Sequence, residues 1–483
     1  MPQREFNIDK GKNFSEWYNT VLYAADLVDS RYNVQGFVVH RPWSVKAFSR
    51  LYALFEAELE ADGHEKVIFP TVIPEENFEK EKEHVEGFVP QVFWITEAGG
   101  EKLSRKLALR PTSETAFYQM YSLWVQAESD LPLKLYQSCS VFRFEHETLP
   151  FIRGREFLWI ETHDAFASKK QAEKQIETDV EIGKKIMTEL LGVPLTVLQR
   201  PFWDKFPGAD ATFAYDVLMP DGRALQVGAT HLLGQNFSKP FGIKYKKASG
   251  GEEFAWQTCF GPGIWRMLAA VVSVHGDGKG LAFPPAIAPL QVVIVPIFRE
   301  ENKKTVLQYA RELKGELEHN GFSAMVDERD KTPGFKYNEW ELKGVPLRVE
   351  VGEKELKQRQ ATLVRRDDRE KKTVERRELA SHAKQLLEKI MDSMRARAET
   401  ELNSRIRQAN NLEEVKKALE KGYARVGFCS LEKDGTDCGK NLQEKTLGGK
   451  VRGRLFGVQE KPSGKCLVCG KKAGVVAYVA RQY

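Results

Sequence analysis

The sequence predicts an α+β domain built on an antiparallel sheet, then an α/β domain, and finally a small, cysteine-rich α+β domain. Three observations lead to this organisation. Residues 1–285 contain short strands, glycine turns and interspersed helices, a mixture typical of antiparallel sheets. Residues 286–385 begin with a β-α-β pattern, and residues 386–483 hold four of the six cysteines.

The composition is that of an ordinary globular protein. Of the 483 residues, 42% are hydrophobic and 29% are charged, enough for several folded cores. The net charge of +5 allows nucleic-acid binding without arguing for it, because solubility alone explains such values. The apolar run at residues 290–298 has the length of a strand, and the N-terminal residues lack the apolar core of a signal peptide. We therefore expect a cytoplasmic protein with no membrane partner.

The first domain should contain a helix in WSVKAFSRLYALFEAELEADG, residues 43–63, with Gly63 as its stop and a strand after it. Its apolar side chains recur at helical spacing, at Phe48, Leu51, Tyr52 and Phe55. Pro70 interrupts the following apolar run and cannot donate a hydrogen bond to a neighbouring strand. We expect Pro70 at a sheet edge or at an interface.

A β-hairpin is predicted at residues 141–166, because side chains alternate between the two faces of a strand. Its polar face carries Arg143, Glu145, Trp159, Glu161 and His163. A half-exposed ribbon with solvated charges would alternate in the same way, but Trp159 among the charges favours a pocket wall. Arg143 suits a phosphate or a carboxylate, while Arg153 and Phe157 offer a second cation and a ring for stacking on a base.

Two further segments could complete such a pocket. GPGIWR combines a glycine-rich turn, Pro262 at a helix start and Arg266 in the first helical turn, where the positive helix end favours phosphate. A buried helix whose arginine pairs with a carboxylate is the alternative. RPTSET places Thr112 and Glu114 where they could accept hydrogen bonds from an ammonium group, although TSET is equally an N-cap.

Gln226 and His231 lie on either side of a glycine in MPDGRALQVGATHLLGQNF. A single histidine of this kind is more often a core residue than a functional one.

The α/β domain begins with the apolar strand in APLQVVIVPIF, an amphipathic helix at residues 303–320, and the strand FSAMVD. Such a unit predicts a parallel strand pair. VPLRVEVG and QATLVRRD supply further strands, and residues 378–421 are expected to form a charged helical connector.

Four cysteines near the C-terminus indicate a structural zinc site. Cys466 and Cys469 form a C-x2-C pair, and Cys429 and Cys438 form a C-x8-C pair. Four thiolates without an open position suit tetrahedral zinc, and disulfides are not expected in the cytoplasm. Free thiols are the alternative, because the first spacing is wide.

Together these motifs resemble the class II aminoacyl-tRNA synthetases, and specifically prolyl-tRNA synthetases of the archaeal and eukaryotic type. FRFE with RGREF is similar to motif 2, GPGIWR to motif 3, and Pro70 matches the proline of motif 1 at the dimer interface. RPTSET, EHETLPFIRGREFLW, THLLGQNF and WELKGVPLRVEVG are similar to the prolyl type in particular. The resemblance covers essentially the whole chain. It implies that a homodimer ligates L-proline to tRNA(Pro) through a prolyl-adenylate, with release of AMP and diphosphate.

The resemblance also implies a role for each pocket residue. For ATP with its Mg²⁺, it assigns Arg143 to the α-phosphate, Glu145 to the adenine amino group, Phe157 to adenine stacking, Arg153 and Arg266 to the outer phosphates, and Gln226 to the ribose or triphosphate. For proline, it assigns Thr112 and Glu114 to the ammonium group, Arg143 to the carboxylate, and Trp159, Glu161, His163, His231 and Cys259 to the surroundings of the ring. Arg143 and Arg266 are the expected catalytic residues.

The same resemblance extends to the other two domains. It implies a class II catalytic domain followed by an anticodon-binding domain, in which Glu341, Arg348 and Lys354 read the anticodon guanines. The zinc-binding C-terminal domain would pack its last residue, Tyr483, back on the catalytic domain. The alternatives are a class II synthetase for threonine or serine, and a catalytically silent relative that binds RNA. The presence of every phosphate-facing arginine argues against a silent relative.

Overall fold

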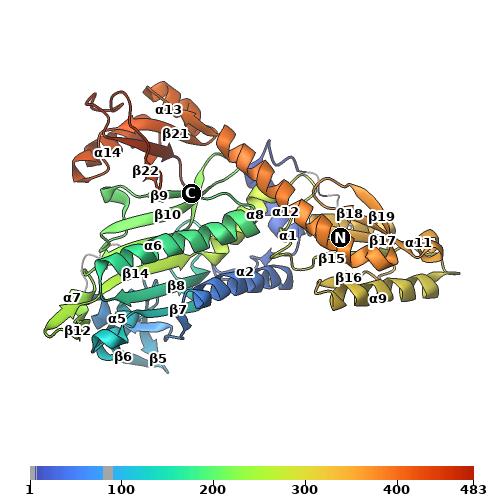
Figure 1. Cartoon of the computed structure of the whole chain (residues 1–483), viewed down its shortest axis with the longest axis horizontal. Helices are drawn as coiled ribbons and strands as arrows, with labels where there is room; N and C mark the ends of the chain where they lie inside the picture. Colours follow the sequence, from blue (N-terminus) through green and yellow to red (C-terminus); the bar gives the residue numbers. More distant parts are fainter. Residues whose placement is uncertain (1–5, 7, 80–90) are drawn as a thin grey trace.

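The computed structural model describes residues 6, 8–79 and 91–483, which form three domains (Figure 1). In that view the first domain fills the lower left, the second lies at the right, and the C-terminal domain stands above the first. The long helix α12 (Leu379–Ser404) runs diagonally from the second domain to the third. Among the described residues, every helix is too short or too polar to span a bilayer.

The first and third domains share one sheet of eleven strands. From edge to edge these are β20 (Ile406–Gln408), β21 (Tyr423–Phe428), β23 (Val475–Ala480), β22 (Lys450–Leu455), β9 (Thr196–Gln199), β10 (Ala211–Leu218), β11 (Ala224–Gly234), β14 (Trp256–Pro262), β8 (Glu156–Phe166), β7 (Leu133–Phe142) and β3 (Glu65–Lys66). Only the two edge pairs, β20 with β21 and β3 with β7, are parallel. The join between the domains is the antiparallel pairing of β22 with β9, where Arg454 lies opposite Gln199.

Three helices pack close to the middle of this sheet: α2 (Pro42–Ala61), α6 (Lys169–Lys184) and α8 (Ile264–His275). The helix α6 packs on β11 and β14, α8 packs on β8 and β11, and α2 packs on α8. Phe48, Leu51 and Phe55 are buried in α2, as their helical spacing predicts. Gly63 follows the helix with a φ of 85°, a left-handed conformation that glycine adopts without strain. The strand expected after it is short, since β3 spans two residues.

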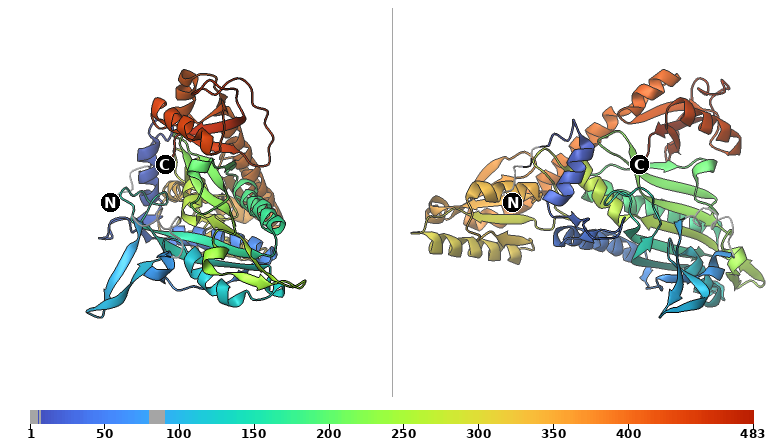
Figure 2. Two further views of the ribbon diagram at one scale, coloured as in Figure 1. Left: turned by 90° about the vertical axis from the view of Figure 1, so that its left-hand side faces the viewer. Right: turned by 180° about the vertical axis from the view of Figure 1, so that it is seen from behind.

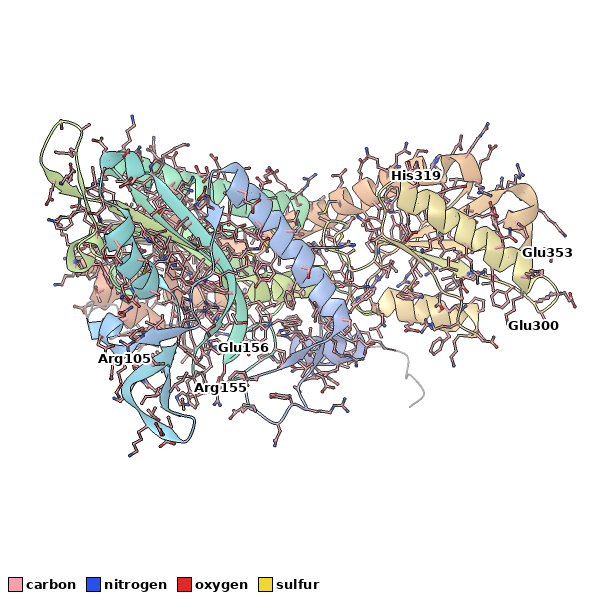
Figure 3. The ribbon with its side chains drawn as sticks, turned by 90° about the horizontal axis from the view of Figure 1, so that it is seen from below. Arg105, Arg155, Glu156, Glu300, His319 and Glu353 are labelled. Carbon is pink, nitrogen blue, oxygen red and sulfur yellow. The ribbon has the colours of Figure 1, made fainter. Side chains whose placement is uncertain are left out.

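The predicted hairpin is present as β7 and β8, which are antiparallel with Cys139 opposite Trp159. Its first strand ends at Phe142, so the strand expected at residues 143–145 is wrong, and Arg143 and Glu145 follow β7. Arg155 and Glu156, labelled in Figure 3, mark where the connecting loop enters β8. The loop itself carries Glu145 and Arg153.

Smaller elements complete the first domain. They are α1 (Phe14–Ala24), β1 (Val28–Asp29), β2 (Val39–His40), β4 (Val72–Pro74), α3 (Glu75–Glu79), β5 (Phe93–Ala98), β6 (Glu101–Leu109), α5 (Glu114–Trp124), α7 (Ser238–Phe241), β12 (Lys244–Lys246) and β13 (Glu252–Phe254). The β5–β6 hairpin projects from the body of the domain (Figure 2, left).

The second domain contains a five-stranded sheet in the order β16 (Ala324–Val326), β15 (Val292–Pro296), β17 (Leu347–Val351), β18 (Gln360–Arg365) and β19 (Lys371–Glu375). The strands β15 and β16 are parallel and α9 (Lys303–His319) connects them, so the predicted β-α-β unit is confirmed. Two further helices are α10 (Pro333–Leu342) and α11 (Glu353–Gln358). Arg366 ties the domain to the first one, because its Nη1 and Nη2 donate to the Asp277 carboxylate at 2.8 and 2.7 Å.

The predicted connector at residues 378–421 is one continuous helix only as far as Ser404. The chain then forms β20 and α13 (Leu412–Leu419), and α14 (Thr436–Lys445) follows later in the same domain. The domain boundary that we propose at residue 386 lies inside α12. At its end the chain returns to the first domain, where the Tyr483 hydroxyl donates to Asp221 at 2.6 Å.

Candidate active site

A cavity of about 310 Å³ opens in the first domain, at the strands β8, β11 and β14. All of the residues predicted to bind a nucleotide or an amino acid line it: Thr112, Glu114, Arg143, Glu145, Arg153, Phe157, Trp159, Glu161, His163, Gln226, His231, Cys259 and Arg266. The polar face of the hairpin is therefore a cavity wall and not a solvated surface ribbon.

One end of the cavity is acidic and buried. The backbone N–H of Ser113 donates to Glu161 Oε2 at 3.1 Å, and Gln137 Nε2 donates to Glu161 Oε1 at 2.9 Å. The hydroxyl of Thr112 donates to Glu114, and His163 Nε2 lies 3.3 Å from Glu161 Oε2. Two carboxylates thus meet in a space from which water is largely excluded, an arrangement that suits a small cation.

The protonation of this end follows from its hydrogen bonds. Burial alone would raise the pKa of Glu161, but the hydrogen bonds from His163, Ser113 and Gln137 hold that pKa below its usual value. For His163, burial lowers the pKa, but its hydrogen bond to Glu161 and the charge of nearby Glu114 raise it more. The pKa of His163 is therefore above its usual value. Glu161 therefore stays ionised, and His163 carries a charge more readily than an isolated imidazole.

The alternative role of TSET as an N-cap is partly correct: Ser113 occupies the N-cap position of a helix, but its side chain makes no capping hydrogen bond. The helix α5 begins at Glu114. The Ser113 hydroxyl donates instead to Glu161. The segment therefore starts a helix and lines the acidic end of the cavity at the same time.

The aromatic wall is formed by Trp159 and Phe157, whose ring centroids lie 5.7 Å apart in an edge-to-face arrangement. A Cβ atom at Gly261 would lie 2.5 Å from the Trp159 ring, so glycine is needed there for space. The strand-to-helix change expected at residues 261–263 is present, with Gly263 as the N-cap, but the helix does not start at Pro262. Pro262 is the last residue of β14, and α8 begins two residues later.

The other end of the cavity is strongly basic. Arg143 Nε donates to the Pro111 carbonyl at 3.0 Å, and Arg266 donates to the carbonyls of Ile152 and Gln226 at 2.9 and 3.1 Å. These backbone bonds fix the two guanidinium groups. Arg153 lies farther out, with its Nε 4.0 Å from a Glu145 carboxylate oxygen.

The pKa of Arg266 is lowered because this cation is buried close to two others. Burial lowers it to about 10, and the neighbouring charges of Arg143 and Arg153 contribute to the shift. Arg266 still stays charged at neutral pH. It lies in the first turn of α8, where the helix dipole adds to the positive potential. This end is built to receive an anion.

His231 and Cys259 lie side by side on paired strands, on β11 and β14. The His231 Nδ1 atom is 2.9 Å from the Thr212 hydroxyl, and the His231 ring packs on Phe206. Burial raises the pKa of Cys259 well above its usual value, so this thiol is a neutral wall residue and not a nucleophile.

Several residues of the cavity do not stand out in the sequence. They are Arg200, Asp204, Lys205, Phe206, Pro207, Thr212 and Trp265. Arg200 comes directly after β9, and its side chain is buried against Asp216, with Nη2 and Oδ1 2.8 Å apart. A single arginine between the apolar stretches TVL and PFW is the only local signal for it.

In the second domain, two of the three residues predicted to read an anticodon are in contact. Arg348 Nη1 donates to Glu341 Oε1 at 3.0 Å, and its guanidinium group lies 4.1 Å from the Tyr337 ring. Lys354 is exposed in the first turn of α11. The far end of this domain, marked by Glu300 and Glu353 in Figure 3, stands clear of the first domain.

The third domain gathers the four predicted cysteine ligands. The Sγ atoms of Cys429, Cys438, Cys466 and Cys469 lie within 4.8 Å of one another. Sulfur atoms bound tetrahedrally to zinc are about 3.8 Å apart, because Zn–S bonds are about 2.3 Å long. The cluster therefore fits a zinc ion without an open coordination position, which is typical of a structural site.

Comparisons with known families match the three domains in turn. Residues 93–275 match the tRNA synthetase class II core domain of the G, H, P, S and T enzymes. Residues 291–386 match the anticodon binding domain, and residues 412–483 match the C-terminal domain of prolyl-tRNA synthetases.

Known proteins match over the full length as well. The proline–tRNA ligase of Thermofilum pendens is 52% identical over 100% of both chains, and that of Pyrococcus abyssi is 43% identical over 98% of both. A solved structure, the Giardia lamblia prolyl-tRNA synthetase in complex with prolyl-adenylate, is 36% identical. It has a TM-score of 0.95 and covers 99% of this chain and 100% of its own.

Proposed function

This chain belongs to the proline–tRNA ligases of the archaeal and eukaryotic type, and we propose that ATP and L-proline react in the cavity at β8, β11 and β14. The family's reaction joins proline to tRNA(Pro) in two steps through a prolyl-adenylate. The observation that carries the proposal is the position of Arg143, Arg153 and Arg266 in the same cavity as the Glu114 and Glu161 carboxylates. The full-length match sets aside a threonine or serine enzyme and a silent relative.

The basic end is the proposed site of the triphosphate, with ATP entering as its Mg²⁺ complex. Arg143 lies at this basic end beside both aromatic rings, and is assigned to the α-phosphate and the proline carboxylate. Arg153 and Arg266 are assigned to the outer phosphates, and Gln226 to the ribose or triphosphate. Phe157 would stack on adenine while Glu145 accepts from its amino group.

The acidic end is the proposed site of proline. Its secondary ammonium would donate to Thr112 and Glu114, and the position of both buried side chains in the cavity lining, beside Glu161, supports this. Trp159, Glu161, His163, His231 and Cys259 would surround the ring.

The chemistry needs no protein nucleophile. The proline carboxylate attacks the α-phosphorus, a P–O bond to the new mixed anhydride forms, and the bond to pyrophosphate breaks. Because two anions must meet, the site has to neutralise and align them. We assign the neutralisation of the reacting carboxylate and α-phosphate to Arg143. The neutralisation of the leaving pyrophosphate is assigned to Arg153 and Arg266, together with the Mg²⁺ that ATP brings.

We propose that Glu341, Arg348 and Lys354 read the two guanines of the proline anticodon. Replacing both guanines is expected to slow aminoacylation by at least about 100-fold, since each well-formed contact to a guanine contributes about 1–3 kcal/mol. Proline-dependent ATP–pyrophosphate exchange without tRNA should not change. Arg348→Ala should reproduce the loss, whereas Arg311→Ala, an exposed arginine on α9, should not. Equal rates of aminoacylation for tRNA(Pro) and for the tRNA without the two guanines would contradict the assignment.

We also propose a homodimer built on the edge of the large sheet. Ile68 and Pro70 are exposed just after the edge strand β3, and Ile68 has 93% of its surface in contact with solvent. The half-exposed Trp124 packs on Phe69, which is buried between Ile68 and Pro70 in the sequence, so a second exposed aromatic side chain lies near them. We expect a solution mass twice the chain's 55.0 kDa by light scattering, and a mass of one chain would refute the dimer.

A further inference from the structure

Close to the cavity, one buried carboxylate holds two arginines from different domains. Asp216 of β10 accepts from Arg200 Nη2 at 2.8 Å and from Arg452 Nε at 2.9 Å. Arg452 lies on β22, in the C-terminal domain, and its Nη2 donates to the second oxygen of Asp216 at 2.9 Å. At most 3% of any of the three side chains is exposed.

The first arginine of this trio reaches the proposed nucleotide site. Arg200 lines the cavity, and its Nη2 donates to the Gln226 side-chain oxygen at 3.0 Å. Because Arg200 donates to the carboxamide oxygen, that oxygen is fixed beside the guanidinium group, and the two N–H donors of Gln226 Nε2 are oriented away from it and can be offered to a ligand. Donors suit the oxygens of a ribose or a phosphate, which is the role proposed for Gln226.

The second arginine anchors this arrangement in the C-terminal domain. Burial tends to raise the pKa of Asp216, but the charges of Arg200 and Arg452 outweigh it and lower the pKa to about 2. Asp216 is therefore ionised at neutral pH, and it uses both oxygens for both cations. Arg200 Nη1 also donates to the backbone carbonyl of Arg452 at 2.8 Å. Without the Arg452 guanidinium group, two buried hydrogen bonds to Asp216 would be lost, and the position of the carboxylate to which Arg200 is bonded would be less constrained.

The end of the chain strengthens the same link. Arg452 Nη1 also donates to the Gln482 side chain, and the Ala224 backbone N–H donates to the carbonyl of Arg481 at 2.8 Å. Ala224 begins β11, two positions before Gln226. The strand that carries Gln226 is thus attached to the C-terminal residues through its backbone as well.

We propose that Arg452 is a positioning residue for the nucleotide: through Asp216 and Arg200 it fixes the carboxamide of Gln226 in the orientation that receives ATP. The proposal rests on the proposed role of Gln226. It makes the zinc-binding domain a part of the activation step, although no residue of that domain is among those that line the cavity.

The test compares two arginines of the same strand. Arg452→Met removes the buried cation, whereas Arg454→Met removes an exposed one that donates to Gln199. In proline-dependent pyrophosphate exchange, we expect Arg452→Met to raise the KM for ATP at least about tenfold and to leave the KM for proline within about twofold. Arg454→Met should leave both values unchanged. Arg452→Lys keeps a charge beside Asp216 and should give an intermediate KM for ATP.

The outcomes separate the two levels of the hypothesis. A wild-type chain without proline-dependent exchange would overturn the proposed function itself. A second outcome would overturn only the positioning role: the wild type is active, and Arg452→Met has a lower maximal rate but normal KM values for ATP and proline. A residue that only stabilises the fold would give this result, because fewer molecules would be folded while each folded molecule would bind ATP normally. Should Arg452→Met fail to fold, Arg452→Lys decides, and an unchanged KM for ATP in that variant refutes the proposal.

Discussion

Replacing Arg143 with alanine is expected to slow proline-dependent pyrophosphate exchange by at least about a thousandfold, because the pocket loses the cation assigned to both reacting groups. Arg143 projects from the end of the hairpin, held by the Pro111 carbonyl and by the rings of Phe157 and Trp159. The measurement is exchange at saturating ATP and proline.

The matched control is Arg105→Ala on the exposed β5–β6 hairpin (Figure 3), which removes the same charge away from the cavity. Both variants should keep the melting temperature of the wild type within a few degrees. Near-normal exchange in Arg143→Ala would refute the assignment of the hairpin, and a similar loss in Arg105→Ala would mean that net charge alone explains the effect.

Loss of the metal should be the largest change in stability. Structural zinc contributes on the order of 10 kcal/mol to the folding of small domains, and the C-terminal domain has only a modest core of its own. We expect Cys466→Ser, or a chelator, to release one zinc per chain and to increase amide exchange in β21, β22 and β23. Metal analysis and hydrogen exchange measure both effects.

Cys139→Ser serves as the control, because Cys139 is a half-buried cysteine of the first domain outside the cluster. It should retain its zinc and the protection of the C-terminal strands. Carefully purified wild-type protein without zinc would contradict the metal site and favour free thiols.

Strand periodicity was sufficient to predict one part of the cavity wall. Since side chains of a strand alternate, Trp159, Glu161 and His163 must share one face, and the structure places all three in the cavity. The β-α-β unit followed from its apolar strand and amphipathic helix in the same way. Thr112 and Gln226 needed the family resemblance, because their local sequences fit ordinary caps and core positions equally well.

The remaining features depend on contacts between distant segments, which local patterns do not specify. Arg200, Asp216 and Arg452 lie in three separate segments of the chain, and only the packed structure makes them partners. The need for glycine at position 261 also arises from a distant segment, because the Trp159 ring on a neighbouring strand leaves no space for a side chain there. The pairing of β22 with β9 depends likewise on how two domains meet.

That pairing matters when the chain is divided. In the intact protein β9 is an interior strand, bonded to β10 on one side and to β22 on the other. A fragment that ends before the C-terminal domain would leave the N–H and C=O groups of β9 unpaired toward water, and an open edge of that kind recruits strands from other molecules. The last domain therefore covers the β9 edge and keeps it from pairing with strands of other molecules, at a place away from the β3 edge proposed for the dimer.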